Sequence, residues 1–395
     1  MTSRERLLTV LRGEIPDCVP VMPDTSNMIP ARLTGKPFWD LYLYNDPPIW
    51  EAYIECAKHF GFDSLMDGYF PFQPTPPGPP DPDYDRYIVY RDEDRIVVQG
   101  ARRDGGRLRW DAHVAVYYRA DPPTGHVNPA DIGLPPEPER WEPLEGVKPV
   151  DCGPEGLKRM KQLMGDQGLV GVWGGANTIV LHNEREIFDY YDDPEKYDCL
   201  AEERIARVDA HFAAIMALEV KPDFVCLGGS GSLVFQTPEI VRRIALPAVK
   251  HAAALYASVG MPTHVHSCGP ETELVRMLAE ETELTVVDPL EVPPMGDCDL
   301  ADLKRRFGDR LVLKGNLHTT DVMLKGTPED VVRASRQAID DAAAGGRFIL
   351  STGDQCGRDT PDANLRAMVE TARTYGRYDR TSGQVLGDRA ACTTG

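Results

Sequence analysis

The chain has 395 residues, and its 43 basic and 62 acidic residues give a formal net charge of −19 at pH 7. This charge argues against a generally basic surface that would bind nucleic acid or anionic lipid. Gly and Pro number 35 and 34, which is below the level of a low-complexity chain, so we expect an ordinary globular protein. No stretch approaches the roughly 20 apolar residues that cross a bilayer, and we expect a cytoplasmic location. The nine cysteines are scattered and odd in number, which favours metal ligation or nucleophilic chemistry over a disulfide framework.

Short β-branched runs alternate with longer amphipathic runs along most of the chain, a pattern typical of βα units and a parallel sheet. Thr237 and Thr327 are placed to cap helices over 238–258 and 328–344. Eight such units predict an α/β fold, a (β/α)8 TIM barrel in one domain over residues 1–379, although a doubly wound open sheet has the same linear pattern. The eight expected strands span 19–22, 63–67, 169–173, 223–227, 262–266, 284–288, 311–314 and 348–352.

Residues 69–150 interrupt this alternation after the second strand. A proline-rich stretch, PFQPTPPGPPDPDYD, is followed by three β-rich runs with turn residues at 92–94 and 104–106, which predicts an antiparallel β-meander. We place this insertion at the mouth of the barrel, with a surface decoration or a dimer contact as an equal alternative. The small, polar residues 380–395 predict a flexible C-terminal tail.

Imidazole and thiol side chains follow two of the expected strands. His266 and Cys268 lie at the end of the fifth strand, and Cys356 follows the eighth. His-x-Cys alone is a weak signal, but the carboxyl ends of all barrel strands meet at one face, so Cys268 and Cys356 can share a site. Three such ligands with an open fourth position are the layout of a catalytic zinc.

Carboxylates and amides also occupy the predicted mouth. Asp288 and Glu291, in VVDPLEVPP, are the candidate catalytic residues, because a carboxylate beside zinc serves as a fourth ligand or a proton acceptor. Each polar residue taken alone is better explained as a helix cap or a solvated loop residue. Only the whole set, at one end of the barrel, supports a functional site. The candidate substrate-binding residues are Asp24, Asp67, Asn177 and Asn316.

The βα units, His266-Ser-Cys268-Gly and the final STGDQCGRDTPDANLRAMVETARTYGRY together resemble the uroporphyrinogen decarboxylase superfamily over most of the chain. Decarboxylases proper carry arginines after the first strand, where this chain has VMPDTSNMIPARLTG, with Asp24 and only a later Arg32. A barrel mouth with so few arginines is poorly suited to bind a tetrapyrrole that carries many carboxylates, because such binding depends on charge pairing. The other branch, the corrinoid-dependent methyltransferases, is similar in its His-x-Cys and later Cys, which implies His266, Cys268 and Cys356 as zinc ligands.

The resemblance implies a zinc-dependent methyltransferase that works with a corrinoid (cobalamin) carried by a partner corrinoid protein. We expect the type that demethylates a small organic methyl donor, a methyl ether or amine, because aromatics of the insertion suit a pocket wall. Core packing of the meander explains these aromatics nearly as well. They are Tyr69, Phe70, Phe72, Tyr84 and Tyr87.

Three alternatives stay open at this point. One is methyl transfer from a methylated corrinoid to a thiol of the coenzyme M kind. Another is a uroporphyrinogen-type decarboxylase that uses Asp67 or Asp24, and the last is a non-catalytic barrel that binds a corrinoid or a tetrapyrrole. The resemblance also implies a homodimer, and we expect neither a nucleic-acid nor a membrane partner.

Overall fold

The core of the fold is a parallel sheet of six named strands. The computed structural model describes residues 1–64, 71–73 and 78–389, and every element below lies within them. All neighbouring strands are parallel, in the order β11-β10-β9-β8-β7-β6. Their side chains are almost all buried, as expected for strands that are covered on both faces. The strands are β6 (Gly171–Trp173), β7 (Phe224–Cys226), β8 (Thr263–His266), β9 (Val286–Asp288), β10 (Val312–His318) and β11 (Phe348–Gly353).

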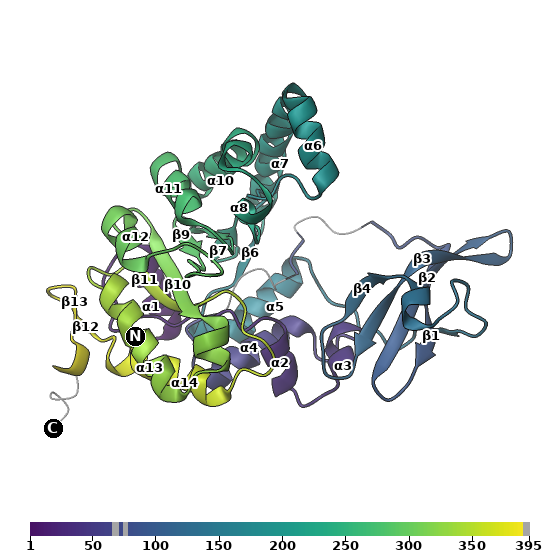
Figure 1. The fold of residues 1–395 in the computed structure, drawn as a ribbon, viewed down its shortest axis with the longest axis horizontal. Coiled ribbons are helices and arrows are strands. Elements are labelled where there is room, and N and C mark those ends of the chain that lie inside the picture. The colour runs from purple at the N-terminus through teal and green to yellow at the C-terminus, as the bar shows by residue number, and fades with distance from the viewer. Residues whose placement is uncertain (65–70, 74–77, 390–395) are drawn as a thin grey trace.

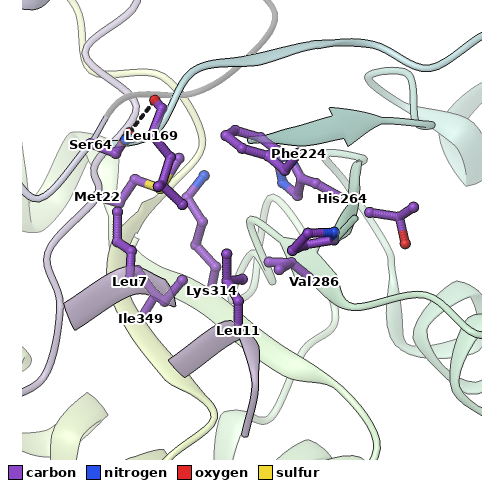
Figure 2. A pocket seen from close by; sticks show the side chains of 12 residues that line it. Leu7, Leu11, Met22, Ser64, Leu169, Phe224, His264, Val286, Lys314 and Ile349 are labelled. Carbon is purple, nitrogen blue, oxygen red and sulfur yellow. Dashed lines mark hydrogen bonds between the residues drawn. The ribbon is translucent and has the colours of Figure 1, made fainter. Parts of the chain in front are cut away.

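Two extended segments close this sheet into a barrel. Val21 forms a parallel bridge with Leu350 of β11, and the Asp63 amide donates to the Val21 carbonyl oxygen at 2.7 Å. On the other side, the Ser64 hydroxyl donates to the Leu169 carbonyl oxygen at 2.9 Å and accepts from the Leu169 amide at 3.1 Å (Figure 2). The (β/α)8 TIM barrel predicted from the sequence is therefore confirmed, with its first two strand positions reduced to these short segments.

Helices follow the strand positions in the expected order and surround the barrel (Figure 1). Within the described residues, no helix combines the length and the apolar character that a bilayer crossing requires. The main helices are α4 (Ile49–Phe60), α5 (Pro154–Met164), α7 (Asp198–Met216), α10 (Leu246–Ser258), α11 (Thr272–Glu281), α12 (Leu300–Phe307), α13 (Pro328–Ala342) and α14 (Asp362–Thr374). The loops add α2 (Met28–Leu33), α3 (Phe38–Tyr42), α6 (Glu184–Asp192), α8 (Ser232–Phe235) and α9 (Pro238–Ile240).

Both helix starts predicted from capping residues are found. Thr327 and Asp330 form a reciprocal capping box at the start of α13, and the Thr237 hydroxyl accepts from the Ile240 amide at α9. A π-helical turn (Val241–Ala245) joins α9 to α10 just before Pro247. Proline has no amide hydrogen for an α-helical bond, and a widened turn accommodates it within a continuous helix.

The short helix α1 (Ser3–Leu11) covers the amino ends of the barrel strands. Its Leu7 packs with Met22, Leu169 and Ile349 in a small apolar cluster. Figure 2 shows this floor and, beside it, Lys314, whose long side chain runs through the barrel interior. A cavity of only about 20 Å³ remains there, room for about one water. The barrel is filled at this end, which leaves the carboxyl end for polar chemistry.

The insertion forms its own antiparallel sheet, as predicted, and Figure 1 shows it as a lobe beside α3. Gly105 and Gly106 adopt φ values of +55° and +85° in the expected turn. Arg358, in the loop after β11, donates to the Ala120 carbonyl oxygen and to the Asp121 carboxylate, each at 2.5 Å. The lobe is thus bonded directly to the loop that carries Cys356. Its strands, ordered β4-β3-β2-β1-β5, are β1 (Tyr84–Arg91), β2 (Arg95–Asp104), β3 (Arg107–Tyr118), β4 (Thr124–Val127) and β5 (Glu142–Pro143).

Part of the segment expected as a C-terminal tail over 380–395 forms a short hairpin in the described residues. A hairpin of β12 (Tyr378–Asp379) and β13 (Gln384–Val385) follows α14, and residues 390–395 lie outside the described residues. The Asp379 carboxylate accepts from the Thr381 amide at 2.9 Å, and Gly383 adopts a φ of +71°. Small, polar residues there build a turn rather than a frayed end.

Asp63 is the residue on which closure most depends. It is fully buried, and its carboxylate accepts from the Val21 amide at 2.7 Å, from Arg6 at 2.5 Å and from Arg373 at 2.8 Å. We expect Asp63→Ala to lower the free energy of unfolding by about 3–5 kcal/mol, because it leaves the buried Val21 amide without this acceptor, removes the carboxylate partner of Arg373 and takes one of two carboxylates from Arg6. Asp17→Ala is the matched control, since Asp17 also pairs with Arg6 but is about one-third exposed, and its loss should cost about 1 kcal/mol. Denaturant unfolding followed by circular dichroism measures both, and equal losses would contradict this role.

Candidate metal centre at the barrel mouth

Three potential ligand side chains converge at the carboxyl end of the barrel. Cys268, Glu291 and Asp354 each offer one ligand atom, and these atoms lie within 4.8 Å of one another. They belong to the loops that follow β8, β9 and β11, which the closed barrel brings to one mouth. Glu291 is buried, and the other two are partly exposed. The cluster can therefore be reached from solvent at Cys268 and Asp354, while Glu291 is shielded.

Neighbouring loops hold these three side chains in place. The Ser230 hydroxyl lies 2.8 Å from the Cys268 sulfur, and the Gly269 amide donates to the Glu291 carboxylate at 2.5 Å. Asp354 adopts a φ of +89°, which few residues other than glycine tolerate and which recurs at functional sites. The backbone itself thus directs Glu291 and Asp354 toward Cys268.

His266 approaches the cluster from the end of β8. Its Nε2 lies 3.7 Å from Asp354 Oδ1, and its Nδ1 lies 3.2 Å from Asp288 Oδ1. Asp288, a candidate catalytic residue, is itself 1% exposed and stands behind His266, away from solvent. Although burial alone would raise the pKa of Asp288, the charges of Lys314 and the nearby imidazoles hold it well below its ordinary value. Among the described residues, Asp288 is thus a buried carboxylate that is linked to the site through His266.

Cys356 lies on the same loop as Asp354. Its sulfur is not part of the group formed by the ligand atoms of Cys268, Glu291 and Asp354. It is fully buried, and its amide donates to the Asp24 carbonyl oxygen at 2.9 Å. Burial raises the pKa of the Cys356 thiol to about 12, with the negative charge of Asp24 adding to the shift. Burial also raises the pKa of Asp24 to about 6. Of the three predicted zinc ligands, the structure brings His266 and Cys268 to Asp354, and it leaves Cys356 beside Asp24.

The electrostatics of the mouth favour a cation. Burial raises the pKa of Cys268, Glu291 and Asp354 above their ordinary values, and the neighbouring negative charges raise all three further. A bound divalent cation reverses this effect because it favours the deprotonated form of every ligand. Thiolate, imidazole and carboxylate are also the ligands that zinc prefers. The residues present therefore fit a zinc ion.

The other candidate residues support the loops around the cluster. The Asn316 side-chain Nδ2 donates to the Leu290 carbonyl oxygen at 3.0 Å, next to Glu291. The Asn177 side chain accepts from the Ile179 amide at 2.8 Å, as a loop cap does. Asp67 lies outside the described residues. Arg32, the first arginine after the first expected strand, pairs with Asp362, so its charge is engaged within the protein.

Sequence reasoning missed Asp354, Ser230 and Lys314. Asp354 stands in the STGDQCG motif two residues before Cys356, and its acidic type was a usable signal. Lys314 is a lysine inside the apolar run LVLKG, which marks a buried charge that needs a partner. Apart from the glycine-rich loop around it, nothing in the sequence indicated that Ser230 belongs to the site.

The architecture and the cluster define a (β/α)8-barrel protein with a candidate metal centre at its mouth. Residues 189–375 match the family described as Uroporphyrinogen decarboxylase (URO-D). The chain is also 32% identical over 142 residues to the methylcobamide:CoM methyltransferase MtbA of Methanosarcina mazei, and 29% identical over 139 residues to MtbA of Methanosarcina acetivorans. Each match covers 35% of this chain and 38% or 37% of the relative's own length.

A solved methyltransferase from Methanosarcina mazei shares the fold. It superposes with a TM-score of 0.57 at 17% sequence identity, over 94% of this chain and 98% of the other. The family match over residues 189–375 and the two MtbA relatives bear out the similarity to the uroporphyrinogen decarboxylase superfamily and its methyltransferase branch that the motifs predict.

The close packing of β7 against β8 should control the position of His266. A Cβ atom at Gly228 would lie 2.6 Å from both the backbone nitrogen and the backbone oxygen of His266. We expect Gly228→Ala to lower the free energy of unfolding by about 1–3 kcal/mol and to weaken zinc binding, because β8 must shift. Gly125→Ala, where nothing lies within 4 Å, is the control and should change neither quantity. Denaturant unfolding and chelator competition measure the two effects, and zinc binding unchanged in Gly228→Ala would contradict the prediction.

Proposed function

We propose that this protein is a zinc-dependent methyltransferase that moves a methyl group between a corrinoid and a small acceptor or donor. The observation that carries the proposal is the convergence of Cys268, Glu291 and Asp354, with His266 beside them, at an open barrel mouth. The similarity to methylcobamide:CoM methyltransferases supports the corrinoid. A corrinoid protein is the proposed partner.

Cys268, Glu291 and His266 are the residues that we expect to hold the zinc, with Asp354 next to them. Cys356 stays a predicted ligand, since it shares the Asp354 loop. Bound zinc would keep a substrate thiol in its thiolate form, which is the nucleophile, at neutral pH. Ser230 orients the Cys268 sulfur, and the Gly269 amide fixes one oxygen of Glu291. Cys268 and Asp354 are partly exposed, and we propose that the corrinoid approaches the centre from that side.

A thiol is the partner substrate that we favour, with methyl passing from the corrinoid to sulfur. The names of the two MtbA relatives give coenzyme M (CoM), a thiol, as their methyl acceptor. The aromatics that pointed to a methyl ether or amine are used elsewhere: Phe72 is buried in the barrel core, and the Tyr87 ring packs 5.4 Å from Trp110 within the lobe. Tyr84 donates to Asp111 on the same sheet. Tyr69 and Phe70 lie outside the described residues, and demethylation of a small donor stays a prediction.

A decarboxylase of the uroporphyrinogen type has less support. Its substrate carries several carboxylates and needs cationic side chains for pairing. The mouth instead gathers Asp24, Glu291 and Asp354, and Arg32 is engaged with Asp362. Repulsion between like charges makes this mouth a poor receptor for such a substrate.

The function is tested by methyl transfer from methylcobalamin to coenzyme M, followed by the cobalamin absorbance. We expect zinc-loaded protein to catalyse the transfer, and Cys268→Ala and Glu291→Gln to slow it by about 100-fold or more, because the metal supplies several kcal/mol of stabilisation. Cys199→Ala, at an exposed cysteine on α7, is the control and should behave as wild type.

Other outcomes would assign other functions. Methylation of cob(I)alamin by a methyl ether or methylamine, without transfer to the thiol, would favour demethylation. Conversion of uroporphyrinogen without metal would favour the decarboxylase. A spectral change on cobalamin binding with no methyl transfer would indicate a non-catalytic barrel.

Zinc affinity should rise with pH between about 6 and 8. Burial raises the pKa of Cys268, Glu291 and Asp354, so protons compete with the metal at low pH and are released when zinc binds. Competition with a chromogenic chelator measures the affinity at each pH. Cys268→Ala, which lacks one competing proton, should give a shallower slope, and a pH-independent affinity would contradict zinc binding at this cluster.

A further inference from the structure

A compact group of buried charges lies directly beneath the cluster. Asp288 Oδ1 is 2.6 Å from His264 Nε2 and 3.2 Å from His266 Nδ1, and Asp288 Oδ2 pairs with the Lys314 ammonium. Asp288 and Lys314 are each 1% exposed, and His264 is 2% exposed. The four side chains come from β8, β9 and β10, three adjacent strands of the barrel.

Hydrogen-bond accounting then fixes one proton on His266. An ionised carboxylate only accepts hydrogen bonds, so the Asp288 oxygens require donors. Lys314 supplies them at Oδ2, and Oδ1 is left to the two imidazoles. His266 therefore donates from Nδ1. Its Nε2, which lies 3.7 Å from Asp354, is then the nitrogen that can offer a lone pair to the cluster.

Stability alone does not account for this arrangement. Replacing a buried ion pair by apolar residues of similar volume is often neutral or stabilising, because burying two charges is costly. The floor just below is apolar, with Leu7, Met22 and Ile349 around the Lys314 stem (Figure 2), so a methionine would suit position 314. A second ion group at the amino end of β7, Asp223 with Arg4 and Lys161, already shows how the barrel carries a carboxylate without any link to the mouth.

We propose that Asp288, held by Lys314 and shared with His264, is a positioning residue that presents His266 Nε2 to the metal centre. The proposal deepens the proposed function and rests on it for the identity of the metal. It also changes the role of Asp288, which acts through His266 and does not touch substrate. Outer hydrogen-bond partners of metal-bound histidines fix the ring orientation and the tautomer in this way.

The first measurement needs no metal. In protein labelled with ¹⁵N-histidine, the signal that disappears in His266→Gln is assigned to His266, and its Nδ1 shift reports whether that nitrogen carries a proton. We expect a protonated Nδ1 in the zinc-free wild type and loss of that state in Asp288→Leu combined with Lys314→Met. The double variant removes both charges at similar volume, so it should still fold. A wild-type His266 without a proton on Nδ1 would overturn the proposal, whatever the protein catalyses.

The second measurement is zinc affinity by chelator competition. We expect Asp288→Asn and the double variant to bind zinc about 10–100-fold more weakly than wild type, with Asp223→Asn unchanged. Thermal unfolding of each variant shows that the comparison is made on folded protein. Wild-type affinity in the folded double variant would reduce Asp288 to a structural role and overturn the proposal, while the zinc-dependent function would stand. Failure of the wild type to bind zinc would instead refute the proposed function.

Discussion

The Asp63 carboxylate replaces part of the backbone hydrogen bonding that a regular strand would provide at the first two strand positions of the barrel. The first two strand positions contribute few backbone bonds to the barrel, and the Asp63 side chain adds one by accepting the Val21 amide. Arg6 and Arg373 neutralise it from α1 and α14. Charge-assisted bonds of this kind are stronger than neutral ones, and they are little screened when buried. Because the strand ends meet only in a closed barrel, the geometry of the mouth depends on this contact.

Two groups of ionisable side chains lie one above the other toward the mouth of the barrel, and only the lower one is fully buried. The lower group is balanced: the Asp288 carboxylate faces the Lys314 ammonium and two imidazoles. The upper group, Cys268, Glu291 and Asp354, gathers potential anions. In the lower group the opposite charges offset one another, whereas in the upper group a bound cation, as proposed, would offset the negative charge. His266 connects the two layers, since one ring nitrogen belongs to each.

Much of the fold could be predicted from the sequence because its signals are local. β-Branched runs, the Thr327 and Thr237 caps and the turn at 104–106 each act within a few residues, and all were found. The sequence did not predict that the first strand would shorten to a single bridge at Val21, or that a hairpin would form at 378–385. At these two places a side-chain hydrogen bond or a turn takes the place of regular strand pairing.

The site was harder to predict, since its members are joined only through space. The motif STGDQCG pointed to the loop after β11, but the positive φ of Asp354 decides which residue of that loop faces Cys268. No periodicity encodes such a backbone reversal. The proposed role of Asp288 was likewise not predictable, because its partner Lys314 lies on another strand. The type of a residue can indicate its chemistry, but the direction in which its side chain points is set by contacts with residues distant in sequence.

The bond from Arg358 to the turn at residues 120–121 has a consequence for how this architecture can vary. The lobe looks like an appendage, yet one of its turns anchors the segment that bears both Asp354 and Cys356. A homologue with a shortened lobe must therefore supply a new acceptor for that arginine or leave the segment untethered. The length of the insertion and the candidate ligands on this segment are therefore coupled, and they should be exchanged together when barrels of this kind are recombined.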